Sequence, residues 1–431
     1  MQHPVLWKRL NDKLNKNMER IAPELNKIDR LEINNFKTTK LFNGTDLYYV
    51  DGVEEDLIRV ELKFHAGRWY EPQKVVSRAV CNLMKKGTSS KTNKQIADII
   101  EFYGAHFEIH HAHDDTAVSI FCLGKYLKEI LPVAEEILTD ASFTDDELEH
   151  FVKKQKQKLQ INAQNTDFHA NRKFNNVLFG EEHPYGYVLF EKDLDAINGE
   201  ILKSYHRIHY NPADATIFVS GKIQHDTIEL INTHFGNYTK NGKVISATDK
   251  SIDTAPENNF FIRKEDSVQS SVRIGGLTIS KKHPDYPDLN ILNTAFGGYF
   301  GSRLMTNIRE DKGYTYGIHS AITHFNHASY FSIETEVGNE VCEKAIEEIY
   351  KEMDLMKKKP LDIDEMTIVQ NYMMTFVMDF RRTYKLEHIY FDPGKWDIKS
   401  ESQPSLDSLA DVPLEDEEEG EDIVCVPSGS S

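Results

Sequence analysis

The feature that most constrains the fold is an internal duplication with a period of slightly more than 200 residues. Three segments of the first half recur in the second half at an offset of 212–218 residues: 117–120 matches 330–333, 135–138 matches 347–350, and 145–148 matches 363–366. A period this long indicates a duplicated domain, because solenoid repeats span only about 20 to 50 residues. Two unrelated α+β domains with chance matches are the alternative that these letters leave open.

The order of predicted elements agrees with a duplication. In the first half, hydrophobic periodicity predicts strands at 40–42, 47–50 and 58–65, helices at 76–86 and 93–103, two strands within 107–123, helices at 126–139 and 144–164, and a strand at 216–219. The second half predicts strands at 271–277, 316–323 and 330–337, and helices at 286–294, 302–310, 341–357 and 362–380. The fold class is therefore α+β: two tandem homologous domains, each a mostly antiparallel sheet covered by helices.

Composition shifts set the predicted boundaries. We expect a polar N-terminal segment at 1–34, a first domain at 35–223, a linker at 224–256, a second domain at 257–380 and a divergent acidic tail at 381–431. Residues 415–422 are nearly all acidic, and because like charges repel and bury nothing, we predict disorder there. The second copy is predicted to be incomplete, because the tail stands where the first copy has helices and a strand.

Charge and hydropathy exclude several classes of protein. The net charge of −18 argues against a nucleic-acid partner. No apolar run approaches the roughly 18 residues that span a bilayer, so we expect no membrane partner. Residues 1–27 contain no apolar signal-peptide region, which favours a cytoplasmic protein and leaves a trimmed periplasmic form open. The four cysteines, Cys81, Cys122, Cys342 and Cys425, are widely separated and fit reduced structural thiols.

Short motifs follow one another in a specific order. The first half contains Lys86-Gly87-Thr88, Tyr103-Gly104-Ala105 with Asp115-Thr116, His183-Pro184-Tyr185-Gly186 and Tyr210-Asn211-Pro212; the second contains Gly301-Ser302-Arg303-Leu304, Ile308-Arg309-Glu310 and Gly313-Tyr314-Thr315-Tyr316. In this order and spacing, from about residue 35 to about 380, the chain resembles the pitrilysin/insulinase zinc peptidases, family M16. The resemblance implies two tandem M16-type (LuxS/metallopeptidase-like) domains.

The zinc-binding motif of that family is degenerate in this chain. Active members carry His-x-x-Glu-His on the first helix, where two histidines hold zinc and the glutamate is the general base. The matching positions here are Arg78, Cys81 and Asn82. The region expected to supply the third ligand, 150–166, contains no Asp or Glu and several lysines, which would repel a dication. We therefore expect no metal and no cofactor in this chain.

A second constellation of the family is present. Arg309 and Tyr316 are seven residues apart, which is the spacing of a pair that in M16 peptidases reaches into the zinc cleft from a second domain or a partner subunit. The guanidinium can bind a substrate carbonyl, and the phenol can stabilise an oxyanion. The resemblance implies that these two residues assist catalysis at a partner's zinc site. The alternative is a surface arginine and a core tyrosine.

A run of histidines invites a metal interpretation. His106, His110, His111 and His113 precede Asp114 and Asp115. Alternation on a strand puts His110 on the face opposite to His111 and His113, so the four histidines cannot converge on one ion. The run aligns with the strand that pairs with substrate backbone in active relatives, which implies substrate binding by Glu108, His110 and His111. We assign no role to His319, His324 or His327.

Three hypotheses for function follow. The first is a zinc-free, Arg/Tyr-bearing subunit of a heterodimeric M16-type metalloendopeptidase, which is not catalytic alone and helps to bind and position unfolded peptides. Its expected partners are peptide substrates and a separate M16 subunit that holds the zinc. The second is a structural or peptide-binding protein with this fold and no role in proteolysis, as in respiratory-chain core subunits. The third is a metal-dependent enzyme that uses the run from His106 to Asp115.

Overall fold

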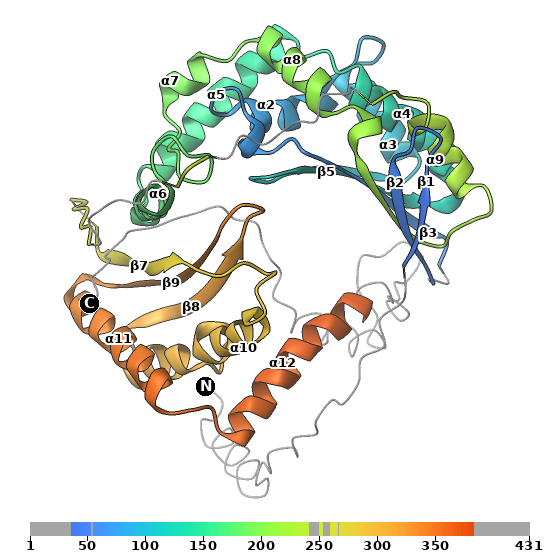
Figure 1. Cartoon of the computed structure of the whole chain (residues 1–431). Helices are drawn as coiled ribbons and strands as arrows, with labels where there is room; N and C mark the ends of the chain where they lie inside the picture. The colour runs from blue at the N-terminus through green and yellow to red at the C-terminus, as the bar shows by residue number, and fades with distance from the viewer. Residues whose placement is uncertain (1–35, 53–54, 241–249, 253–258, 266, 383–431) are drawn as a thin grey trace, which may run out of the picture.

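The computed structural model describes residues 36–52, 55–240, 250–252, 259–265 and 267–382. The predicted N-terminal segment, much of the predicted linker and nearly all of the predicted acidic tail lie outside the described residues. The described part forms two units that each combine one sheet with covering helices (Figure 1).

The first unit is built on a six-stranded mixed sheet. Its strand order is β1-β2-β6-β3-β5-β4, and every neighbouring pair is antiparallel except β2 with β6. The strands are β1 (Lys37–Lys40), β2 (Asp46–Asp51), β3 (Leu57–Phe64), β4 (His106–His111), β5 (Thr116–Leu123) and β6 (Thr216–Gly221).

Alternating side chains explain why the central strands of this sheet form. On β5 the even-numbered residues from Thr116 to Cys122 are buried and the odd-numbered residues are partly exposed, and β3 alternates in the same way. One face of such a strand packs on the core and the other does not. The helices are α2 (Val76–Leu83), α3 (Asn93–Phe102), α4 (Leu127–Thr139), α5 (Asp145–Asn162), α6 (Thr166–Phe179), α7 (Glu191–Asp195), α8 (Gly199–His209) and α9 (Thr227–Phe235).

The second unit repeats half of the first sheet. Its three strands are β7 (Gln269–Leu277), β8 (Thr315–His324) and β9 (Ser329–Gly338), in the order β7-β9-β8 with both pairs antiparallel. This is the arrangement of β3, β5 and β4 in the first unit, and the matching segments 117–120 and 330–333 lie on the corresponding strands β5 and β9. The predicted fold, two units of mostly antiparallel sheet with helices, is confirmed.

Among the described residues, the second unit has three α-helices, of which α10 and α11 cover one side of its sheet and α12 packs on α10. They are α10 (Tyr286–Gly297), α11 (Cys342–Lys358) and α12 (Ile363–Arg382), with a π-helix over Met305–Asp311. Figure 1 shows α10 and α11 on the outer face of the sheet, and α10 contacts both β8 and α12.

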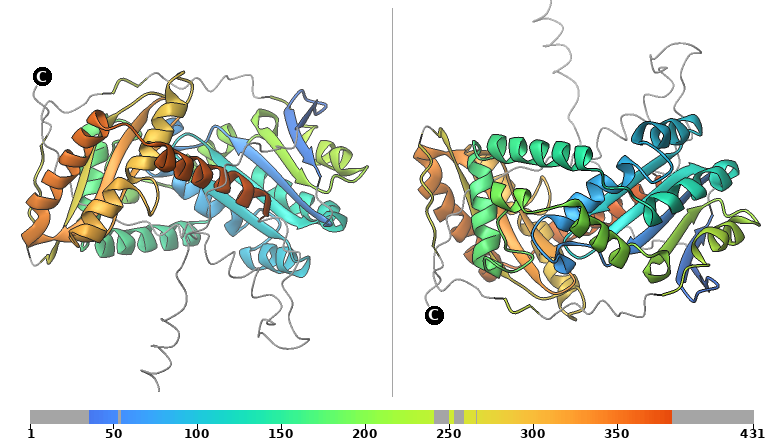
Figure 2. Two further views of the ribbon diagram at one scale, coloured as in Figure 1. Left: turned by 90° about the horizontal axis from the view of Figure 1, so that it is seen from below. Right: turned by 90° about the horizontal axis from the view of Figure 1, so that it is seen from above.

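Helix α6 of the first unit packs against the second sheet. It contacts β7, and both views in Figure 2 keep it beside the strands of the second unit. Arg273 of β7 lies 3.7 Å from Asp167 of α6 and also pairs with Glu334 of β9. The buried ring of Phe174 on α6 packs closely against Gly275 of β7. A side chain at Gly275 would not fit, because its Cβ would lie only 2.8 Å from the ring. The two units are therefore joined by packing.

Two local expectations need correction. Residues 227–235, predicted to lie in the linker, form helix α9, and its Ile231 and Phe235 are fully buried in the first core. The predicted helix at 144–164 has Thr144 as its N-cap residue. A Thr followed three residues later by Glu, here Glu147, is the pattern of a capping box, but the side chain of Thr144 makes no capping hydrogen bond. Three acidic residues in the first turn of α5 supply favourable charge at that end of the helix.

Glu136 should make stability depend on pH. Burial disfavours the ionised carboxylate, but hydrogen bonds from Lys91, Ser90 and Thr88 outweigh burial and lower the pKa of Glu136 to about 2. A lowered pKa stabilises the fold at pH values above the unfolded pKa, and this contribution is lost as the pH falls towards the folded pKa. The free energies of unfolding of the parent and of Glu136→Gln, measured with urea, should differ by a constant amount from about pH 7 to about pH 5. This difference should shrink to zero as the pH approaches about 2.

Glu149→Gln on the exposed face of α5 is the matched control for this experiment. It removes the same charge without removing that cluster of donors, so its effect on stability should be small at every pH. A Glu136→Gln difference that stays constant down to pH 2 would contradict a lowered pKa.

Candidate functional site

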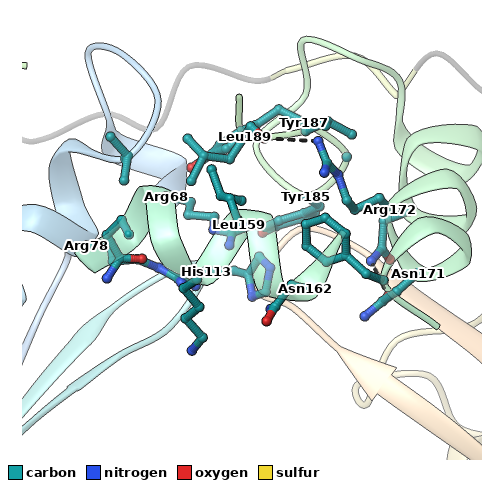
Figure 3. A pocket seen from close by; sticks show the side chains of 17 residues that line it. Arg68, Arg78, His113, Leu159, Asn162, Asn171, Arg172, Tyr185, Tyr187 and Leu189 are labelled. Atoms are coloured by element: carbon teal, nitrogen blue, oxygen red, sulfur yellow. Dashed lines mark hydrogen bonds between the residues drawn. The ribbon is translucent and has the colours of Figure 1, made fainter. Parts of the chain in front are cut away.

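A cavity of about 370 Å³ lies in the first unit between α2, α5 and α6. Residues 185–189 close its remaining side, and Figure 3 shows side chains from all these segments pointing into it. A hydrogen bond of 2.9 Å from the Arg172 side chain to the carbonyl of Leu189 connects α6 to the segment 185–189. Of the three positions at which the resemblance to M16 peptidases places the zinc motif, Arg78 lines this cavity.

The three degenerate positions on α2 point in different directions. Arg78 is half-buried and lines the cavity, whereas Asn82 is exposed and donates a hydrogen bond to the carbonyl of Arg78 at 2.9 Å. Cys81 faces the core, 3.6 Å from the hydroxyls of both Thr116 and Tyr210, and burial raises the pKa of its thiol to about 11. A thiol of this kind is a packing residue and neither a nucleophile nor a ready metal ligand.

Helix α5 presents amides and a lysine to the cavity where a metal-binding carboxylate would be required. Gln155, Lys158 and Asn162 line it from this helix. No cluster of three or more His, Cys, Asp or Glu side chains suited to a metal ion occurs among the residues that the structure describes. The donors present at this cavity are those of an anion site, not of a zinc site.

The histidine run divides between the two faces of β4. His106, Glu108 and His110 are exposed, whereas His111 is turned inward, with its Nε2 2.6 Å from the hydroxyl of Ser77 on α2. Burial lowers the pKa of His111 well below its usual value, so the ring is neutral at pH 7. Of the predicted substrate-binding residues, the structure therefore brings Glu108 and His110 together and separates His111. Their role in binding substrate stays a prediction.

Strand β4 is the edge of the first sheet. It pairs with β5 on one side, and among the described residues no strand pairs with its other side. An open edge of this kind can accept an extended peptide through backbone hydrogen bonds. The exposed Glu108 and His110 point away from the core on this strand.

Arg309 and Tyr316 line one surface hollow of about 690 Å³ in the second unit. The guanidinium of Arg309 lies 4.6 Å from the ring centre of Phe300, and Tyr316 is 93% exposed. The interpretation of Tyr316 as a core residue is therefore wrong. An exposed phenol beside a guanidinium is available to a ligand or to a second protein.

Local backbone features hold the pair in this position. Arg309 lies on the π-helix, a rare geometry that is frequent at functional sites. Gly313 then adopts a φ of +66° and turns the chain into β8. The pairing register of β8 shifts between Thr315 and Ile318, and an irregularity of this kind can re-aim a side chain.

Two contacts between the units were not foreseen from the sequence. Buried Asp114 accepts hydrogen bonds from the Tyr185 hydroxyl and from the backbone N–H of Asn326, the latter at 2.7 Å. His327, which was given no role, stacks on Trp69 with ring centres 3.8 Å apart. Both contacts join residues more than 200 positions apart, so no local pattern could have indicated them.

Sequence comparison supports the same relationship for both units. The family description "Insulinase (Peptidase family M16)" matches residues 52–181, and "Peptidase M16 inactive domain" matches residues 196–373. The Bacillus subtilis protein called uncharacterized zinc protease YmxG is 23% identical over 293 residues, covering 68% of this chain and 70% of that protein. A Mycobacterium leprae protein, also called an uncharacterized zinc protease, is 28% identical over 260 residues, covering 58% and 57%.

Solved structures agree on the fold. A peptidase M16 inactive domain from Pseudomonas fluorescens superposes with a TM-score of 0.69 at 22% identity, covering 79% of this chain and 83% of that one. A protease from Helicobacter pylori superposes with a TM-score of 0.73 at 17% identity, covering 82% and 86%. In the described part of this chain, no helix has the length and apolarity needed to cross a membrane. The chain belongs to the M16 (insulinase) peptidase family, and its residues 196–373 match the inactive domain of that family.

Proposed function

We propose that this protein is the zinc-free subunit of a heterodimeric M16-type metallopeptidase, in which a separate chain holds the zinc. In this role Arg309 and Tyr316 assist the partner's zinc site, and the edge strand β4 with Glu108 and His110 helps to bind unfolded peptides. The chain by itself hydrolyses nothing, because Arg78, Cys81 and Asn82 replace the residues that bind zinc and activate water.

The observation that carries the proposal is the exposed Arg/Tyr pair. A tyrosine that is 93% exposed beside an arginine contributes little to the stability of its own unit. It is placed where a second protein or its substrate can contact it. In a cleft that excludes water, a preorganised phenol or guanidinium can stabilise the oxyanion of a tetrahedral intermediate.

The proposal predicts peptidase activity only from a mixture. This chain and a zinc-bearing M16 relative from the same source should together cleave a quenched unstructured peptide, whereas this chain alone should be silent. Arg309→Ala and Tyr316→Phe should each lower the kcat of the mixture about a hundredfold or more, the range seen when one oxyanion donor is removed. Initial rates over a range of peptide concentrations separate kcat from KM.

Lys312→Ala is the matched control, because Lys312 follows the π-helix and does not line the hollow. It should leave the rate of the mixture unchanged. If mixing gives no gain in activity, or if the Arg309 and Tyr316 variants match the parent mixture, the chain is a structural or peptide-binding M16-fold protein. The exposed edge of β4 favours that second function over a metal-dependent enzyme.

A further inference from the structure

The cavity of the first unit is strongly cationic. Four basic side chains line it: Arg68, Arg78, Lys158 and Arg172. No Asp or Glu lines it among the residues that the structure describes, so the nominal charge of its lining is +4. Figure 3 shows Arg68 and Arg78 on one side of the cavity and Arg172 on the other.

Two ionisable groups lie close to these cations, the carboxyl of Glu71 and the imidazole of His113, and the charge of Arg68 acts on the pKa of both. Glu71 does not line the cavity; it accepts hydrogen bonds from Ser77 and from the hydroxyl of Tyr187, and burial raises the pKa of its carboxyl. His113 lines the cavity, but burial, with Arg68 and Arg78 nearby, lowers its pKa to about 3. His113 is therefore neutral at pH 7 and can share the site with an anion.

The remaining lining matches a peptide better than a simple inorganic ion. Side-chain amides, which can both donate to and accept from a peptide backbone, come from Gln155, Asn162, Asn171 and Asn175. Apolar surface comes from Leu159, Phe168, Val188 and Leu189. Phosphate needs only the cations, whereas a chain end with a carboxylate, an amide and a side chain would use all three kinds of surface.

We propose that this cavity binds the C-terminal carboxylate of a peptide, held between the arginines of α2 and α6. Arginine is suited to this task because its planar fork matches a carboxylate with two parallel hydrogen bonds. The proposal goes beyond the proposed function, since the site lies within one unit of this chain and needs neither the zinc-bearing subunit nor proteolysis. Binding to the isolated chain and activity of the mixture can therefore fail independently.

The test compares two forms of one short unstructured peptide that differ only at the C-terminus, a free carboxylate against a carboxamide. Fluorescence anisotropy with the full chain, at one low ionic strength, should show binding of the carboxylate form about 10- to 100-fold tighter, as for loss of a charge-assisted hydrogen bond. Equal affinities would overturn the proposal. Inorganic phosphate and acetate serve as competitors, and displacement by phosphate alone would identify a phosphate site and also overturn it.

Substitutions then locate the carboxylate. Arg78→Gln and Arg172→Gln should each remove most of the preference for the carboxylate form while leaving the carboxamide form nearly unaffected. Lys154→Gln, on α5 but outside the lining, makes the same charge change and should preserve the preference. If both peptides lose affinity equally in the arginine variants, or if Lys154→Gln removes the preference as well, the cavity does not hold the carboxylate.

Discussion

Replacing Phe174 with alanine should lower the free energy of unfolding by about 3 to 5 kcal/mol, the range measured for buried Phe→Ala changes. The ring is almost completely buried where α6 of the first unit meets the second sheet, 5.8 Å from the ring of Tyr330. Gly275 on β7 faces the ring and has no side chain that could move into the space left by the ring, so we expect a cavity to remain. Urea unfolding followed by circular dichroism measures the change.

The matched control is Phe102→Ala at the end of α3, where the ring is 81% exposed. Surface substitutions of this kind change stability by only about 0.5 kcal/mol. Comparable losses for the two variants would show that α6 does not depend on the second sheet for its packing. A lower midpoint with an unchanged slope for Phe174→Ala would show that stability changed without a change in the surface exposed on unfolding.

Replacing Asp114 with alanine should lower the free energy of unfolding by about 1 to 3 kcal/mol, because it leaves the buried hydroxyl of Tyr185 without an acceptor. The Tyr185 hydroxyl and the N–H of Asn326 both donate to this carboxylate. Each buried donor that loses its partner costs about 1 to 3 kcal/mol. Since Asn326 belongs to the second unit, the substitution also removes a link between the units. Urea unfolding of the full chain measures the loss.

Two further variants isolate the cause. Asp115→Ala removes a neighbouring carboxylate whose partner is the partly exposed Lys63, at 2.7 Å, and such pairs contribute about 0 to 1 kcal/mol. Tyr185→Phe should be destabilising in the parent but much less so beside Asp114→Ala, because the hydroxyl then has no acceptor to lose. Strictly additive losses would mean that the two side chains do not act through this hydrogen bond.

Much of the fold followed from local patterns in the sequence. The alternation of β3 and β5 and the helical periodicity of α4 and α11 are properties of neighbouring residues, and each element lies close to its predicted position. The duplication predicted two similar units, and the strand order β7-β9-β8 repeats the order β3-β5-β4 of the first unit. The loss of the zinc motif was also local, since Arg78, Cys81 and Asn82 lie on one turn of one helix.

The contacts between distant segments depended on the tertiary structure. No local signal joins Arg68 to Arg172, Asp114 to Asn326, or α6 to β7, because each contact depends on how complete elements pack. The sequence predicts that the lysines of α5 repel a dication, but the place of one of them, Lys158, in a cationic cavity depends on the positions of α2 and α6. The sequence determined which residues replace the zinc ligands. Only the packing of helices more than 60 residues apart in the chain decided that one of these residues, Arg78, shares a cavity with Lys158 and Arg172, because proximity of side chains in space is set by the whole core.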